Sequence, residues 1–207
     1  DTVIAIEMAR RTALKLKKRG LHALIAPPIT FCVSELGAEF PGTVSLPADT
    51  VVALLRDVST AVAKKFRAVA LVGVNQEAAN LDAIRRATEE AKKAGASVCL
   101  TEFAKKRWND RLVAAFNAGD HAGSFETSLM MAFARAHVRE KERIILPPMD
   151  PLGPGLKKGA KTFAEAGGED AYFGDPTAAS AEEGEAHFEV LSDILTLSIL
   201  EHLGSKV

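Results

Sequence analysis

Amphipathic helical segments alternate with short apolar runs along this chain, and that alternation constrains its fold more than any other feature. The run over residues 67–74 is almost wholly apolar, which is typical of a parallel strand buried on both faces. Stretches with apolar residues at helical spacing stand before and after it. This order predicts parallel α/β layers, and the length of 207 residues suits one domain with a proper core.

The pattern predicts a definite series of elements. Strands are expected over residues 21–26, 67–74 and 96–101. Helices are expected over residues 3–18, 51–64, 81–94, 103–117, 124 to about 138, and 178–203. Residues 144–168 are rich in Pro, Gly and Lys and predict a long surface loop, and His187 and His202 are expected on the solvent side of the last helix.

Composition excludes several classes of function. The chain is 47% hydrophobic and 26% charged, and its 26 basic and 27 acidic residues give a net charge of −1. Nothing in this balance indicates binding to nucleic acid or to a membrane. Because Asp1 and Thr2 lead directly into a helical pattern, we expect no signal peptide and a cytoplasmic protein. Cys32 and Cys99 have no metal or redox spacing and are expected to be reduced packing residues.

The stretch from Asp120 to Ser128 carries the most chemistry. Asp120 and His121 are adjacent, and a small Ala-Gly hinge separates them from an apolar helical run. Ser124 is expected to cap that helix and Glu126 to lie in its first turn. A helix start offers free N–H groups, and an imidazole beside it can exchange protons near neutral pH. An ordinary capped helix with a histidine in the preceding loop is the alternative.

Four motifs in the same order resemble the creatininase (creatinine amidohydrolase) family. Residues 121–128 read His-Ala-Gly-Ser-Phe-Glu-Thr-Ser, similar to the family's His-Ala-Gly-x-x-Glu-Thr-Ser. Residues 40–46 read Phe-Pro-Gly-Thr-Val-Ser-Leu, and the strand from Phe66-Arg67 resembles the one that leads into the family's Asn-Gly-His loop. Residues 174–184 resemble the family's Gly-Asp-Pro-x-x-Ala-Thr-Ala-Glu-Lys-Gly. The resemblance covers nearly the whole chain.

This resemblance implies a three-layer α/β/α fold with a mainly parallel sheet and a single creatininase-like domain over residues 1–207. It also implies a metal-dependent amidohydrolase that cleaves a C–N bond of a cyclic amide or formamide. One or two divalent ions, Zn²⁺ or Mn²⁺, would polarise the carbonyl and lower the pKa of a bound water. The expected partners are a small-molecule substrate and further copies of the chain in a homo-oligomer.

Site residues follow from the resemblance by position. Asp1 and Glu77 are the implied metal ligands, His121 is the implied proton donor, and Asp120 would orient it or act as a second acid. The supporting residues are Asn75, Glu126 and Trp108. Asn75 falls at the loop histidine of the family, Glu126 would hold the loop or face a neighbouring subunit, and Trp108 would line a pocket or pack in a core or interface. In a second register of this loop, Glu77 takes the place of the histidine.

The chain departs from the family at several ligand positions. The family carries a strand and a Glu-x-His metal motif before the first helix, and we expect both to be absent from this chain. Leu36 and Gly37 stand where the family has Glu-His. Carboxylate and amide ligands favour harder ions, so Mn²⁺ or Mg²⁺ would suit the site better than Zn²⁺. A non-catalytic binding or scaffold protein and a lactone hydrolase are therefore the alternative functions.

Overall fold

The computed structural model of the chain describes residues 1–108, 110–112 and 121–205. Contacts between Cα atoms group the chain into two compact units. The first unit comprises Asp1–Ser34, Gly42–Glu102 and Asp193–Val207, and the second comprises Glu35–Pro41 and Phe103–Ser192. Each unit is described by itself, and the single domain expected over residues 1–207 stays a prediction.

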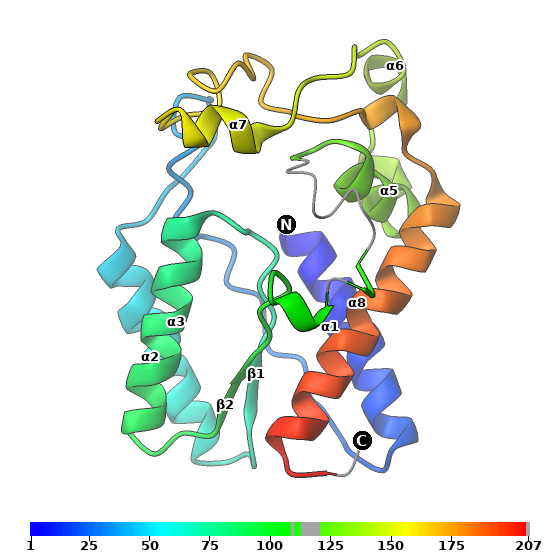
Figure 1. Cartoon of the computed structure of the whole chain (residues 1–207). Coiled ribbons are helices and arrows are strands. Elements are labelled where there is room, and N and C mark those ends of the chain that lie inside the picture. Colours follow the sequence, from blue (N-terminus) through cyan, green and yellow to red (C-terminus); the bar gives the residue numbers. More distant parts are fainter. Residues whose placement is uncertain (109, 113–120, 206–207) are drawn as a thin grey trace. The chain divides into compact units, whose positions relative to one another are not determined.

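The first unit is a parallel β-α-β arrangement with further helices (Figure 1). Its elements are helices α1 (Thr2–Lys18), α2 (Ala48–Ala63) and α3 (Ala78–Lys93), strands β1 (Val69–Leu71) and β2 (Val98–Leu100), and the end of helix α8 (Ala181–His202). The two strands pair in parallel with Val69 opposite Val98 and Leu71 opposite Leu100. Helix α3 makes the crossover between them, as the alternating pattern predicts.

Small side chains let α2 and α3 pack closely in the core of this unit. Ala83, Ala87 and Ala91 recur every four residues on α3, which places them on one face of the helix, and each is at most 1% exposed. Val51 and Val52 of α2 pack with Ala83 and Ala87 in one cluster. The two helices therefore lie side by side along much of their length (Figure 1).

The second unit consists of short helices and connecting loops. Its elements are the 3-10 helices η1 (Lys106–Trp108), η2 (Arg135–His137) and η3 (Pro176–Ala178), helices α5 (Ser124–Phe133), α6 (Glu140–Arg143) and α7 (Leu152–Lys157), and the first part of α8. Helices α5 and α8 cross very closely, because a Cβ atom on Gly184 would lie 1.9 Å from the carbonyl oxygen of Ser128. The hydroxyl of Ser128 accepts a hydrogen bond from the backbone N–H of Ser180 at 3.0 Å.

The strand expected over residues 21–26 is wrong. Residues 22–31 are extended and exposed, and their backbone groups have no hydrogen-bond partner among the described residues. Four large apolar side chains of this segment are exposed: Leu24, Ile25, Ile29 and Phe31 are 80%, 47%, 42% and 52% exposed. The sequence has the composition of a buried strand, but a strand needs a neighbour to pair with.

Other boundaries and burial also differ from the expectations. Helix α5 is capped by Gly123, so Ser124 is its first residue and not its cap, and the helix ends at Phe133, well before residue 138. His187 is only 9% exposed, because its ring packs 4.7 Å from that of Phe125, whereas His202 is exposed. The stretch over residues 144–168 is not wholly loop, since it contains α7. The helix expected over residues 103–117 lies partly outside the described residues, which include only η1 in that stretch.

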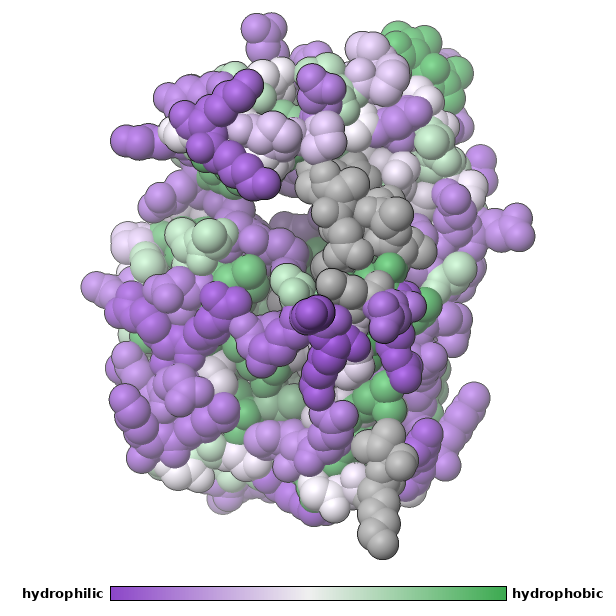
Figure 2. Space-filling view, in the orientation of Figure 1, coloured by the Kyte–Doolittle hydropathy of each residue, from purple (hydrophilic) through white to green (hydrophobic). Residues whose placement is uncertain are grey.

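The surface is mainly polar on the face drawn in Figure 2. Ile144 and Ile145, which follow α6, are 56% and 77% exposed, and strongly hydrophobic surface is visible at the α6 end of that view (Figure 2). In the described part of the chain, no helix combines the length and apolar character that crossing a membrane requires.

Candidate active site

His121 begins the best-defined functional element of the second unit. Its backbone N–H donates to the carbonyl of Phe173 at 3.2 Å, and the N–H of Phe173 donates back to the carbonyl of His121 at 2.8 Å. This pair of bonds fixes the backbone of His121. The side chain is half-buried, and its ring nitrogens have no hydrogen-bond partner among the described residues. The backbone of His121 is therefore fixed, while its imidazole nitrogens make no hydrogen bond that the described residues supply.

The loop after His121 contains a strained residue and is held by side-chain hydrogen bonds. Ala122 has φ of 51°, a left-handed conformation that is uncommon for a residue with a Cβ atom. A carboxylate oxygen of Glu126 accepts a hydrogen bond from the N–H of Ala122 at 2.7 Å, which is the contact that a loop-holding role requires. The Thr127 hydroxyl donates to the carbonyl of Ala122 at 3.3 Å. Strain that neighbouring groups maintain in this way is concentrated at functional sites in proteins.

An aromatic ring covers one face of His121. The ring of Phe163 stacks on the imidazole with centroids 4.3 Å apart and an angle of 28° between the planes. Phe163 in turn lies 5.9 Å from Phe173 and 6.5 Å from Phe40, measured between ring centroids. One face of the histidine is thus occupied by protein.

Polar groups gather at the start of α3 in the first unit. The Ser34 hydroxyl donates to a carboxylate oxygen of Glu77 at 3.1 Å. The side-chain oxygen of Asn75 accepts from the N–H of Glu77 at 2.8 Å, and its amide nitrogen donates to the Cys32 sulfur at 3.4 Å. Asn80 is 2% exposed, and its side-chain oxygen has no hydrogen-bond partner in the part of the chain that the structure describes. These contacts form a polar cluster at one end of β1.

The Cys32 thiol belongs to the same cluster. Burial raises the pKa of this thiol above its ordinary value, the hydrogen bond from Asn75 opposes that rise, and the negative charge of Glu77 adds to it. Sequence reasoning treated Cys32 as a packing residue and did not single out Ser34. The strand predicted before them is absent from the structure, so their position in the sequence offered no sound signal.

The predicted site residues fall into the two separate units. Asp1, Asn75 and Glu77 belong to the first unit, whereas Trp108, His121 and Glu126 belong to the second. Asp120 lies outside the described residues.

Trp108 is only 4% exposed, and the guanidinium of Arg107 lies 4.1 Å from its ring centroid. Its indole nitrogen has no hydrogen-bond partner within the described ranges. Such burial favours the packing role over the pocket-lining role.

A catalytic zinc site uses three protein ligands and a water. In the described ranges, no three His, Cys, Asp or Glu side chains are grouped so that they could hold a metal ion. Asp1 and Glu77 provide carboxylate donors, and the nearby Asn75 provides an amide. The described residues alone therefore do not fit a complete catalytic metal centre.

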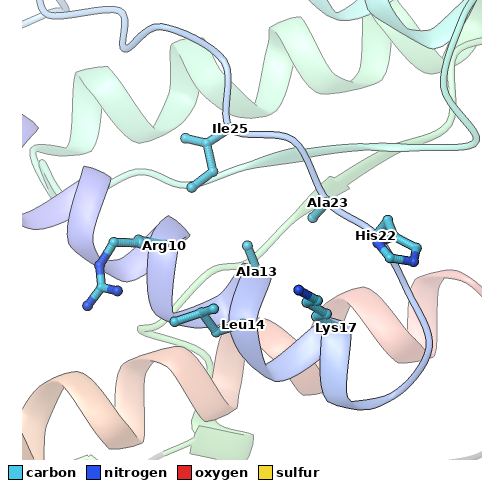
Figure 3. Close-up of a pocket in the computed structure, with 7 residues that line it drawn as sticks. All are labelled: Arg10, Ala13, Leu14, Lys17, His22, Ala23 and Ile25. Atoms are coloured by element: carbon cyan, nitrogen blue, oxygen red, sulfur yellow. The ribbon is translucent and has the colours of Figure 1, made fainter.

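A separate pocket of about 250 Å³ lies between α1 and the extended segment that follows it (Figure 3). Apolar side chains such as Leu14 and Ile25 line it together with the basic groups of Arg10, Lys17 and His22. None of the residues predicted for the site lines this pocket. The candidate functional groups are therefore the His121 loop in the second unit and, by itself, the Glu77 cluster in the first.

Comparisons with solved structures agree with this fold. The chain is similar to a creatinine amidohydrolase (creatininase) with a TM-score of 0.69 and 21% identity, over 98% of this chain and 82% of that one. A second structure, described as creatininase Mn, gives a TM-score of 0.67 at 21% identity over 95% of this chain and 80% of that one. A mutant creatininase complexed with creatine gives 0.65 at 20% identity over 97% and 83% of the two chains. The expected creatininase-like α/β fold is thereby confirmed, with a small parallel sheet in the described residues.

Curated relatives and a family model define the relationship. The chain is 30% identical over 205 residues to mycofactocin precursor peptide peptidases of Mycobacterium ulcerans (strain Agy99) and Mycobacterium tuberculosis (strain ATCC 25618 / H37Rv). The match covers 93% of this chain and 74% of each relative. The family model for creatininase, described as creatinine amidohydrolase, matches residues 1–199. On these grounds, the chain belongs to the creatininase family of hydrolases.

Proposed function

We propose that this chain hydrolyses the C–N bond of an amide, with His121 as the proton donor. The observation that supports this proposal best is the His121 imidazole, whose nitrogens have no hydrogen-bond partner among the described residues. It precedes a strained residue held by Glu126. A short peptide is the first substrate class to consider, because the curated relatives are named as peptide peptidases. Cyclic amides and formamides are the second, as the resemblance to creatininase implies.

The proposed chemistry needs two proton transfers. Water adds to the carbonyl carbon and loses a proton to a general base. The C–N bond then breaks while His121 gives a proton to the leaving nitrogen, so the products are a carboxylic acid and an amine. Proton transfer by a positioned side chain typically contributes about 10²–10⁴-fold to the rate of such reactions.

The metal part of the proposal is separate. The creatininase fold includes structures described as Mn and Zn forms, and Asp1 and Glu77 are the residues proposed to contact such an ion here. When bound, a divalent ion would polarise the amide carbonyl. Because the described residues do not complete the usual set of three ligands, any ion would be held weakly by these carboxylates. The expected homo-oligomer also remains a proposal.

The test examines one variant in each unit. Peptides, cyclic amides, formamides and lactones are assayed with the wild type, with His121→Ala and with Glu77→Gln. We expect each change to lower kcat by about 10²-fold or more. Exposed residues provide the matched controls, His137→Ala and Glu89→Gln.

Two results would count against the proposal. Full activity of His121→Ala would remove His121 from the chemistry, and full activity of Glu77→Gln would remove Glu77 from it. Turnover of lactones alone would identify the bond as an ester. The scaffold alternative gains support from the incomplete set of metal ligands. It predicts no turnover of any substrate in the panel by the wild-type chain.

A further inference from the structure

We infer that Phe163 is a positioning residue for His121, one that fixes the plane of the imidazole by stacking on it. This inference rests on the proposed role of His121 as proton donor. It identifies a residue 42 positions later in the sequence (163 − 121) that none of the four motifs includes. The hydrogen bonds around His121 leave the orientation of its imidazole ring undetermined.

The backbone around His121 is fixed, but hydrogen bonds do not fix its side chain. The paired bonds with Phe173 hold the main chain of His121, and Glu126 holds the N–H of the next residue. The ring nitrogens have no partner among the described residues. Metal-binding and catalytic histidines usually have one ring nitrogen oriented by a hydrogen bond. In this part of the chain, the described contact that orients the ring is with an aromatic face.

The stacking geometry is suited to that role. A centroid distance of 4.3 Å and an interplanar angle of 28° place the two rings face to face and in van der Waals contact. Rotation of the imidazole out of this plane would bring its edge into the Phe163 ring. The stack therefore restricts the torsion angles of the His121 side chain and leaves its ring nitrogens at the edge, where a leaving nitrogen can approach.

Phe163 can position another residue because it is itself held firmly. It is 5% exposed, and its backbone N–H donates to the carbonyl of Leu36 at 2.8 Å. Its carbonyl accepts hydrogen bonds from the N–H groups of Ala166 and Gly168 at 3.1 and 2.8 Å. The ring of Phe173 lies so close to Gly168 that a Cβ atom there would be 2.5 Å from it. The aromatic residues therefore have little room to shift.

The experiment compares Phe163→Leu with Phe163→Tyr, which keeps the ring. We expect Phe163→Leu to lower kcat by about ten- to a hundredfold, since small misplacements of a catalytic group have effects of this size, and to change KM by less than about twofold. Phe163→Tyr should restore most of kcat. Phe133→Leu removes an aromatic ring that is 43% exposed in the same unit and is the matched control.

A readout independent of turnover is the order of the His121 ring in NMR relaxation of its ¹³C-labelled imidazole. We expect Phe163→Leu to increase the mobility of that ring while the unfolding midpoint shows that the variant is still folded, and Phe163→Tyr to leave the ring ordered. Unchanged kcat and unchanged ring order in Phe163→Leu would overturn the inference. If His121→Ala retains full activity, the proposed function fails, and the ring order by itself then decides whether Phe163 holds His121.

Discussion

Glu7 shows at the scale of one residue how a buried charge is accommodated in this chain. Its side chain is fully buried in α1, and its two oxygens accept hydrogen bonds from Arg10 at 2.6 and 2.7 Å and from Arg11 at 2.6 Å. Burial works to raise the pKa of this carboxyl, and the hydrogen bonds and charges of the two arginines outweigh it, so the pKa lies below the ordinary 4.5. Glu7 therefore contributes to stability as a carboxylate.

The free energy of unfolding should depend on pH in a way that shows the contribution of the Glu7 carboxylate. A group whose pKa is lowered by folding stabilises the protein above its unfolded pKa, and that contribution is lost as the pH falls from about 4.5 through the folded pKa. We expect Glu7→Gln to lower the free energy of unfolding at pH 7 by about 1–3 kcal/mol. It should also flatten the loss of stability between about pH 5 and pH 3. Urea denaturation across this range measures both effects, and Glu89→Gln, at an exposed site, is the control.

The roles and surroundings of single residues were the hardest features to predict from the sequence. The motif over residues 121–128 correctly indicated a helix start after a hinge, but Gly123 rather than Ser124 caps it. His187 was expected in solvent, and this expectation was wrong. A helical pattern with alanines and glycine does not show which face of the helix another helix will cover. Phe163 is adjacent to no motif residue, so only the folded chain brings it to His121.

At the scale of elements, the crossing of α5 and α8 depends on Gly184. Ser128 is fully buried at this point, and its carbonyl oxygen occupies the place where a side chain at position 184 would begin. A glycine inside a helix is ordinarily destabilising relative to alanine, so its presence here is explained by the close approach. The resemblance included Gly184 in a motif, but only the packing shows why a side chain cannot be accommodated.

We expect Gly184→Ala to lower the free energy of unfolding by about 2–3 kcal/mol, because a methyl group 1.9 Å from a carbonyl oxygen forces the helices apart. Gly153→Ala in α7 is the matched control, since a Cβ atom there would have no neighbour within 4 Å. That control should change stability by less than about 1 kcal/mol. Chemical denaturation of both variants gives the comparison, and equal stabilities would show that the two helices can separate without cost.

For the whole molecule, the sequence predicted the class of fold well and the extent of the sheet poorly. Helices α1, α2, α3 and α8 lie close to their predicted ranges, because each carries an apolar stripe at helical spacing. Strands β1 and β2 have the predicted order, yet each has three residues. Strand pairing depends on neighbours that are distant in sequence, so apolar composition cannot fix where a strand begins or ends.

Metal content depends on ligands from the whole chain. We expect the purified 207-residue chain to lose any Zn²⁺ or Mn²⁺ on gel filtration after treatment with a chelator, since Asp1 and Glu77 do not complete a ligand set among the described residues. Excess Mn²⁺ should then bind only weakly and reversibly, and Glu77→Gln should weaken this binding further. Elemental analysis and titration calorimetry measure these quantities, and one or two tightly held ions per chain would contradict the expectation.

The extended segment over residues 22–31 has a consequence for how this polypeptide behaves at high concentration. Eight of its ten residues have a backbone N–H without a partner among the described residues, while Pro27 and Pro28 have no N–H to offer. Leu24, Ile25, Ile29 and Phe31 add exposed apolar surface beside this backbone. Exposed backbone of this kind can pair with another extended chain, and the two prolines interrupt that pairing. Crowding of identical copies therefore favours intermolecular β-structure at residues 22–26, where a lysine or a further proline is the substitution suited to suppress it.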